Sequence, residues 1–130
     1  MKSKLAKFVL AMILLAALGN TTAAGTQVTQ LQLYRDQGID QTDQARGRQL
    51  WYSVVDGRGC TSCHGNNPAA TGKHAKTGKT IEPMALSVSP ARYQDGKKLE
   101  KWFLRNCKWT LGRQCSLQEK ADLLTWLANQ

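Results

Sequence analysis

The side chains with the clearest chemistry lie in one short stretch of the 130-residue chain, Cys60-Thr61-Ser62-Cys63-His64. Two cysteines separated by two residues and followed directly by a histidine form the C-x-x-C-H arrangement that attaches haem c. Each thiol adds to one vinyl group of the porphyrin, and the imidazole reaches the iron from the proximal face. The motif therefore predicts one covalently bound haem c, held by Cys60, Cys63 and His64, with His64 as an iron ligand.

The same cysteine spacing allows three alternative interpretations. A thioredoxin-like redox pair also uses C-x-x-C, but it lies at a strand-to-helix turn of a sheet, and the chain has no strand pattern. A zinc site normally needs a second matched pair of ligands, whereas Cys107 and Cys115 stand eight positions apart with no histidine nearby. The motif could also occur by chance. Haem attachment is favoured because an export signal and a helical pattern accompany the motif.

The motif does not specify the residue that faces His64 across the iron. Met84 is the only methionine after the first 24 residues, and a methionine sulfur is the usual second ligand of an electron-transfer cytochrome c. Met84 follows His64 by only 20 positions, however, and a thioether that fills a gap in the core accounts for it equally well. His74, in a lysine-rich loop, is a weaker candidate.

Asn106 is a further candidate for the distal position. Apolar spacing of three and four residues places Trp102, Phe103 and Asn106 on one face of a predicted helix over 97–106. An unpaired amide on an apolar face costs free energy, so Asn106 needs a partner, and iron would be one. A hydrogen-bonded core asparagine or a helix C-cap accounts for the same spacing, and from periodicity alone such a structural role is favoured.

Hydrophobic periodicity predicts an all-α chain, because no run alternates as a half-buried strand does. The segment 65–88, rich in Gly, Pro, Lys and Thr, is predicted to be a long ordered loop. Two helices are predicted before the motif: a short one over 27–34 that Gly38 stops, and one over 41–55 capped by Thr42 or Asp43. After the loop, a turn over 90–94 follows Ser89, and the helix over 97–106 comes next. A last helix begins at the capping-box pattern of Ser116 and Glu119.

Gly47 is unusual inside the predicted helix over 41–55. A glycine there costs about 1 kcal/mol relative to alanine, so another backbone or a large ring is expected to press on that face. The pattern Gly47-x-x-x-Trp51 before the C-x-x-C-H motif, with Trp126 in the last helix, resembles the small class I cytochromes c. The resemblance implies that the first and last helices cross at right angles and that the glycine lets the aromatic residue approach.

The first residues predict export. Lys2, Lys4 and Lys7 precede an apolar run over 8–18 and a small-residue stretch, as in a signal peptide, here cleaved near Ala24. The run is shorter than the roughly 20 residues that cross a bilayer, so no stable membrane insertion is expected. The predicted location is the periplasm. The predicted segments are a signal peptide over 1–24, an N-terminal extension over 25–40 and one domain over 41–130.

The composition is strongly basic. Eighteen lysine and arginine residues against 9 acidic ones give a net charge of +9, of which about +6 remains after the signal. This charge favours an acidic partner, for which Lys73, Lys76, Lys79, Lys108 and Arg113 are candidate contacts. No nucleic acid is expected, because an exported domain seldom meets one and the basic residues form no long run. A basic face that only keeps the protein soluble accounts for the charge about as well.

Seven segments between residues 41 and 130 together resemble the sphaeroides haem protein group of c-type cytochromes. They are ARGRQLW, CTSCHG, TGKTIEP, SPARYQD, EKWFLRNC, GRQCS and QEKADLLTWLANQ. The resemblance implies that Asn106 is the sixth ligand in the oxidised state and leaves on reduction, which opens the iron to O2, NO or CO. It also implies a disulfide between Cys107 and Cys115, and a dihaem cytochrome c as electron donor.

The expected function is that of a periplasmic monohaem cytochrome that accepts electrons and binds small diatomic ligands. Two alternatives from other classes are open. An ordinary His/Met-ligated electron carrier would need Met84 on the iron. An enzyme, such as an oxygen or peroxide reductase or an NO dioxygenase, would need turnover at the open iron, but no catalytic acid or base stands out in the sequence.

Overall fold

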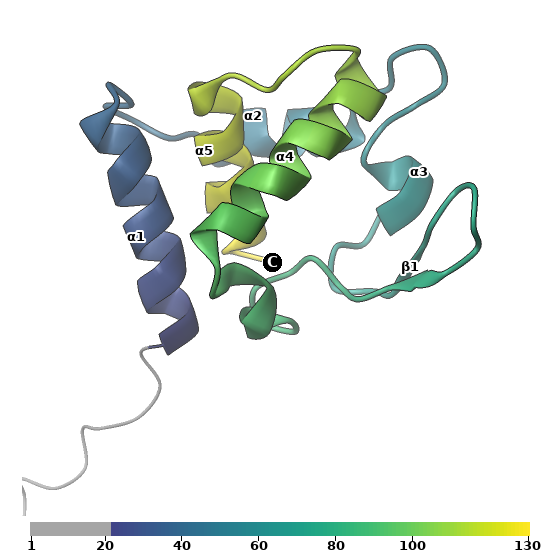
Figure 1. Ribbon diagram of the computed structural model, residues 1–130, viewed down its shortest axis with the longest axis horizontal. Helices are drawn as coiled ribbons and strands as arrows, with labels where there is room; N and C mark the ends of the chain where they lie inside the picture. Colours follow the sequence, from purple (N-terminus) through teal and green to yellow (C-terminus); the bar gives the residue numbers. More distant parts are fainter. Residues whose placement is uncertain (1–21) are drawn as a thin grey trace, which may run out of the picture.

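The computed structural model describes residues 22–130, and the side chains from residue 29 onwards (Figure 1). The predicted signal peptide therefore lies almost entirely outside the described residues. The elements are α1 (Thr22–Asp36), α2 (Gln44–Tyr52), α3 (Thr61–His64), β1 (Gly72–Lys73), β2 (Thr80–Ile81), the 3₁₀ turn η1 (Pro90–Tyr93), α4 (Gly96–Leu111) and α5 (Leu117–Leu127). Among the described helices, none is long and apolar enough to cross a membrane.

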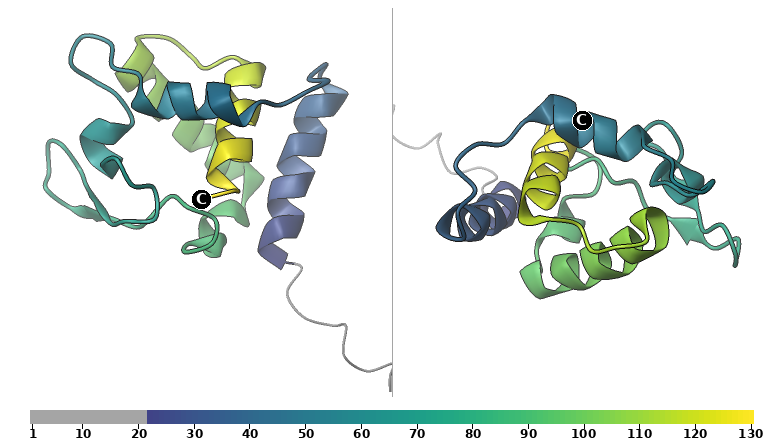
Figure 2. Two further views of the ribbon diagram at one scale, coloured as in Figure 1. Left: turned by 180° about the vertical axis from the view of Figure 1, so that it is seen from behind. Right: turned by 90° about the horizontal axis from the view of Figure 1, so that it is seen from above.

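Helices α2 and α5 cross in close contact, with α2 running across α5 in Figure 2. A Cβ added to Gly47 would lie 2.2 Å from the backbone oxygen of Asp122 and 2.8 Å from Cβ of Trp126. The Trp51 and Trp126 rings pack beside this point, with centroids 5.4 Å apart. The predicted role of Gly47 is confirmed: only a residue without a side chain lets the two backbones come this close.

Asp122 fastens the start of α2 to α5. One carboxylate oxygen accepts from Asp43 N at 2.7 Å, and the other accepts from Arg46 Nε at 2.6 Å. Burial of Asp122 raises the pKa of its carboxyl, but the hydrogen bonds from Arg46 and Asp43 outweigh this, so the pKa is below its usual value. Asp43 is also the N-cap of α2, as predicted, and accepts from Ala45 N at 2.7 Å.

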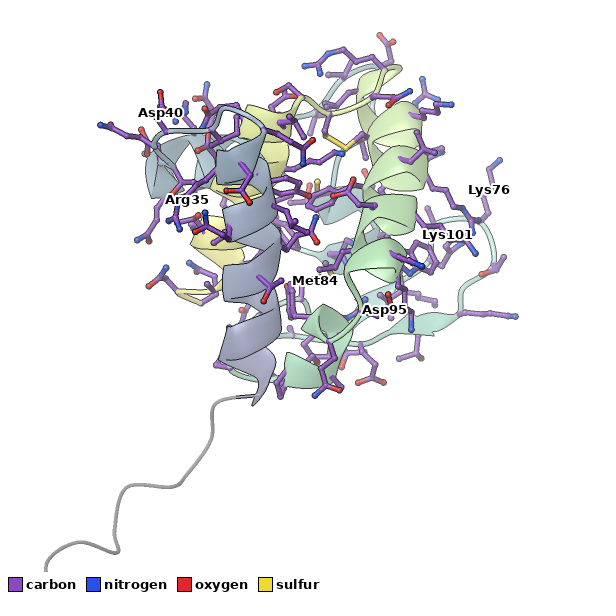
Figure 3. All side chains as sticks on the ribbon, turned by 60° about the vertical axis from the view of Figure 1, so that its left-hand side comes forward. Arg35, Asp40, Lys76, Met84, Asp95 and Lys101 are labelled. Atoms are coloured by element: carbon purple, nitrogen blue, oxygen red, sulfur yellow. A yellow bond between two sulfur atoms is a disulfide. The ribbon has the colours of Figure 1, made fainter. Side chains whose placement is uncertain are left out.

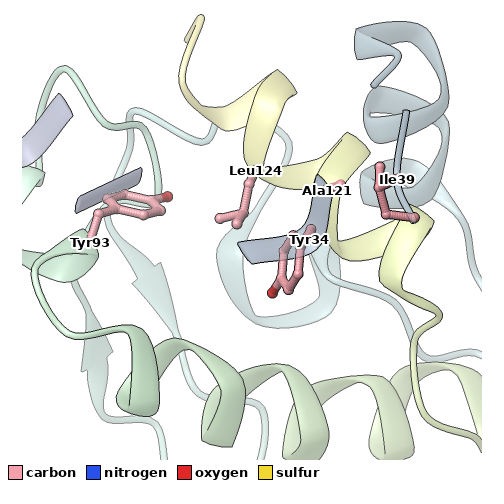
Figure 4. Close-up of a cluster of buried hydrophobic side chains, with 5 residues drawn as sticks. All are labelled: Tyr34, Ile39, Tyr93, Ala121 and Leu124. Carbon is pink, nitrogen blue, oxygen red and sulfur yellow. The ribbon is translucent and has the colours of Figure 1, made fainter. Parts of the chain in front are cut away.

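The N-terminal helix α1 packs against α5. Its Tyr34 is buried in one cluster with Ile39, Tyr93, Ala121 and Leu124 (Figure 4). Helix α1 is longer than the predicted 27–34, and the chain turns at Gly38, where φ is +100°. The division at residue 40 into an extension and a domain stays a prediction. A second cluster, around α2 and α5, contains Trp51, Leu123, Trp126 and Leu127.

Helices α4 and α5 are joined by a short bridged segment. α4 continues beyond the predicted 97–106 to Leu111, and Gly112 follows it in the left-handed conformation. Cys107 and Cys115 form a disulfide with their Cα atoms 5.5 Å apart, drawn as the yellow bond in Figure 3, so the implied pairing is confirmed. The predicted capping box is present, because Ser116 and Glu119 exchange side-chain and backbone hydrogen bonds.

The segment 65–88 departs from the expectation of a chain without paired strands. Strands β1 and β2 pair antiparallel, with Gly72 opposite Ile81, and close a small hairpin. Each strand has only two residues, too few to show the alternation that signals a strand in sequence. The fold remains all-α, as predicted, and the turn η1 begins at Pro90.

Candidate haem-binding site

Helix α3 is a single turn that brings the motif residues together. His64 N donates to Cys60 O at 3.0 Å, and Ser62 Oγ accepts from Gly59 N at 3.0 Å at the start of the turn. The thiols of Cys60 and Cys63 are free and half-buried. Burial raises the pKa of the Cys60 thiol to about 11.

The imidazole of His64 lies against the crossing of α2 and α5. Its ring centroid is 5.6 Å from that of Trp51, which is 1% exposed. Burial, and then the positive charge of Arg92, lower the pKa of His64 to about 4. The imidazole is therefore neutral at pH 7, which is the form that binds a metal.

These residues fit a covalently bound haem. Two free thiols and a neutral imidazole on one helical turn are the donor set that haem c requires. Cys60 also packs, with Met84, against the buried apolar cluster around Trp51. The Nε1 atom of Trp51 is buried and has no hydrogen-bond partner among the described residues, so this donor remains available beside His64.

The β1–β2 hairpin lies directly against α3. A Cβ added to Gly72 would be 2.4 Å from the backbone oxygen of Cys63, and Ala75 N donates to Cys63 Sγ at 3.4 Å. The predicted loop therefore contacts the attachment helix itself. The same hairpin segment carries three exposed lysines, Lys73, Lys76 and Lys79.

The two alternative distal ligands have structural roles of their own. Met84 is half-buried, its N donates to Pro68 O at 2.7 Å, and its carbonyl accepts from the Tyr93 hydroxyl. The Nδ1 atom of His74 accepts from Lys76 N at 3.3 Å and Thr77 N at 3.2 Å, inside the hairpin turn. The Met84 side chain packs against the cluster around Trp51, and this histidine nitrogen stabilises a turn.

Asn106 lies on α4, one residue before the disulfide. Its backbone oxygen accepts from Thr110 Oγ1 at 2.9 Å. The predicted helical face is only partly correct, because Phe103 is half-buried whereas Asn106 and Trp102 are exposed, the latter by 43%. Asn106 stands at the edge of the buried stripe, so the cost of an unpaired buried amide, on which its candidacy partly rested, does not apply in this structure.

Arg92 is a residue near the site that sequence reasoning missed. Its Nε donates to Pro83 O at 3.0 Å and its Nη2 to Glu82 O at 2.9 Å, so it fixes the segment before Met84. Its charge also contributes to the lowered pKa of His64. No local pattern could have shown this, because both roles depend on groups in other elements.

The crossing of α2 and α5 and the C-x-x-C-H turn packed against it define a small c-type cytochrome with one covalently bound haem c. The family described as a domain of unknown function, DUF1924, matches residues 37–127. The cytochrome c-type protein SHP of Cereibacter sphaeroides is 45% identical over 93 residues, which are 68% of this chain and 71% of the relative. The chain belongs to the SHP family of c-type cytochromes.

Solved structures agree with this assignment. The structure of oxidised SHP, described as an oxygen-binding cytochrome c, superposes with a TM-score of 0.73 at 39% identity and covers 86% of this chain and 100% of its own. The solution structure of cytochrome c'' from Methylophilus methylotrophus, described with insights into haem-ligand detachment, has a TM-score of 0.64 at 30% identity and covers 83% of this chain and 93% of its own.

Proposed function

We propose that this protein is an exported electron-accepting cytochrome that binds a small diatomic molecule, such as O2, NO or CO, at a distal position. Asn106 occupies this position in the ferric protein and leaves it in the ferrous protein. Support comes from the oxygen binding named for SHP and the haem-ligand detachment named for cytochrome c''. Export to the periplasm rests on the signal-like sequence over 1–24.

The observation that carries this proposal is the contrast between Asn106 and Met84. The Asn106 amide is exposed on the flank of α4, beside the disulfide at Cys107, whereas the half-buried Met84 side chain packs against the cluster that contains Trp51. A side chain that binds and leaves needs room to move, and Asn106 has that room. A half-buried thioether packed against a buried cluster has less room to move.

The chemistry of the two side chains points the same way. The haem supplies the change of iron charge and the site for the diatomic ligand. The amide oxygen of Asn106 is a neutral, hard donor that suits the ferric state better than the ferrous state, whereas the soft thioether of Met84 would hold the ferrous state more firmly. Reduction should therefore weaken the bond between the Asn106 amide oxygen and the iron.

Absorption spectra of two variants test the proposal. Asn106→Ala should remove the six-coordinate ferric species and leave a five-coordinate or water-bound one. Met84→Leu is the matched control and should leave the ferric and ferrous spectra nearly unchanged. If Met84→Leu disrupts both spectra while Asn106→Ala is silent, an ordinary His/Met-ligated electron carrier is the better account.

The partner that fits this surface is an acidic redox protein, such as the dihaem cytochrome c that the sequence resemblance implies. The exposed lysines of the hairpin place positive charge beside Cys63, at the edge where the haem would be attached. Lys108 is also exposed, on α4. Arg113 contributes less than the sequence suggested, because it pairs with both carboxylate oxygens of Glu119, at 2.7 and 2.8 Å.

A further inference from the structure

A cluster of polar side chains ties α4 to α1 and α5. Glu100 Oε1 accepts from Gln30 Nε2 at 2.8 Å and from the Tyr34 hydroxyl, and Oε2 accepts from Lys120 Nζ at 2.6 Å. Figure 4 shows the Tyr34 hydroxyl pointing toward α4. Helix α1, which is distant in sequence, and α5, which follows α4 in the chain, thus both contact one carboxylate of α4. We call Gln30, Tyr34, Glu100 and Lys120 the Glu100 cluster.

The Glu100 cluster is a stronger tether than an ordinary surface ion pair. Gln30 and Tyr34 are 5% and 1% exposed, so the core fixes both donors. The Lys120 side chain is 16% exposed, and its Nζ lies 5.9 Å from the centre of the Phe103 ring. The Glu100 side chain itself is 39% exposed, so the advantage of the cluster comes from its buried partners and from charged hydrogen bonds, which are stronger than neutral ones.

Glu100 and Asn106 lie on opposite flanks of the side of α4 that faces the core. An α-helix turns about 100° per residue, so their side chains point about 120° apart around the axis. Phe103 and Cys107 lie between them and face the core. A helix held on one flank by Glu100, and at Cys107 by the disulfide, cannot roll about its axis without breaking one of these tethers.

We infer that Glu100 is a positioning residue for the distal side of the haem. Through the Glu100 cluster, α1 and α5 fix the rotation of α4 about its own axis, and this rotation determines whether the Asn106 amide reaches the iron. This inference rests on the proposed function, because it takes Asn106 as the ferric ligand. A ligand must be held to within about 0.5 Å of its bonding position, so a small roll of α4 is enough to lose it.

Glu100→Gln tests this role, because it keeps the shape of the side chain and removes its charge. In the ferric holoprotein, the ratio of five- or water-coordinate to Asn106-bound haem should rise roughly fivefold or more, read from the absorption spectrum. The affinity of the ferrous protein for CO should stay within about twofold of wild type, since Asn106 has already left the iron. A general loss of structure would change both readouts.

Two further variants complete the design. Glu82→Gln makes the same chemical change at an exposed residue outside the Glu100 cluster and should alter neither readout. Tyr34→Phe removes one hydrogen bond and keeps the ion pair with Lys120, so it should shift the ferric ratio in the same direction by less. It also serves as the decisive variant if Glu100→Gln does not fold.

The outcomes separate this inference from the proposed function. If Asn106→Ala loses the six-coordinate ferric form but Glu100→Gln and Tyr34→Phe both keep the wild-type ferric spectrum, the ligand assignment survives and the positioning role of Glu100 is wrong. If Asn106→Ala is silent, the ligand assignment fails and the inference about Glu100 fails with it.

Discussion

Helices α2 and α4 are attached to the rest of the molecule in different ways. Helix α2 meets α5 backbone against backbone at Gly47, with the Trp51 and Trp126 rings packed beside the contact. Helix α4 is held by side chains instead, through the Glu100 cluster and the disulfide. His64, the proposed proximal ligand, lies against the first contact, and Asn106, the proposed distal ligand, lies on the helix held by the second.

This difference suits the two proposed roles. A close-packed contact resists displacement because any movement opens a void or forces a clash, so His64 is held in place against Trp51. A helix held by a few side-chain tethers moves when one of them loosens. The two kinds of attachment are consistent with the proposal that His64 stays on the iron and that Asn106 leaves it on reduction.

The largest expected effect is on the α2–α5 crossing. Gly47→Val should destabilise the holoprotein by about 3 kcal/mol or more, because the new side chain would meet the backbone of Asp122, which cannot move aside alone. Denaturant unfolding measures this change. Gln49→Ala, at an exposed position of the same helix, should change stability by less than about 0.5 kcal/mol. Equal effects of the two variants would contradict the close crossing.

Removing the disulfide should loosen the distal side while leaving the proximal side intact. The double variant Cys107→Ser and Cys115→Ser should lose about 2–3 kcal/mol of unfolding free energy, as expected for closing so short a loop. Its ferric spectrum should show more five-coordinate haem, because the backbone next to Asn106 loses a restraint. Haem attachment, read by intact mass after denaturation, should be unchanged. A ferric spectrum identical to wild type would argue against a restraining role.

Asp122→Asn should weaken the junction of α2 and α5 in a pH-dependent way. The folded-state pKa of Asp122 is below the ordinary value of 3.8, so its ionised form stabilises the fold above that pH, and the contribution is lost as the pH falls below it. The variant should be less stable by on the order of 2 kcal/mol at pH 7, with the difference shrinking below about pH 4. If the difference in unfolding free energy between the variant and the wild type did not change with pH, the negative charge of Asp122 would not be the source of the stabilisation.

The smallest expected effect on stability is at the hairpin. Replacing Lys73, Lys76 and Lys79 by Gln should leave unfolding nearly unchanged but slow reduction by an acidic dihaem cytochrome c. The salt dependence of that rate should also flatten, since exposed charges act over about 8–10 Å at ordinary ionic strength. The double variant Lys97→Gln and Lys98→Gln, which removes exposed charges on α4, is the control and should leave the rate and its salt dependence nearly unchanged. If the hairpin variant kept the salt dependence of the wild type, these lysines would not guide the partner, and their charge would only keep the protein soluble.

Local patterns in the sequence predicted the start of α5, and the C-x-x-C-H motif predicted the cofactor. The C-x-x-C-H motif is a single helical turn, and the capping box of Ser116 and Glu119 acts within four residues, so both are encoded in adjacent positions. Gly47 could be interpreted because a glycine inside a helix implies a close neighbour. Asn106 came mainly from a resemblance, since helical spacing alone favoured a core asparagine, and its role stays a prediction.

The sequence by itself determined the chemistry of this protein: two thiols and an imidazole within one helical turn require no distant residue to specify haem attachment. Only the tertiary structure decided how the helices around that chemistry are held. Glu100 bonds to Gln30 and Tyr34, which are 70 and 66 positions away, and Arg92 influences His64 from another element. Such pairings follow from the packing of helices in space and leave no local pattern in the chain, because each partner taken alone is an ordinary polar residue on a helix.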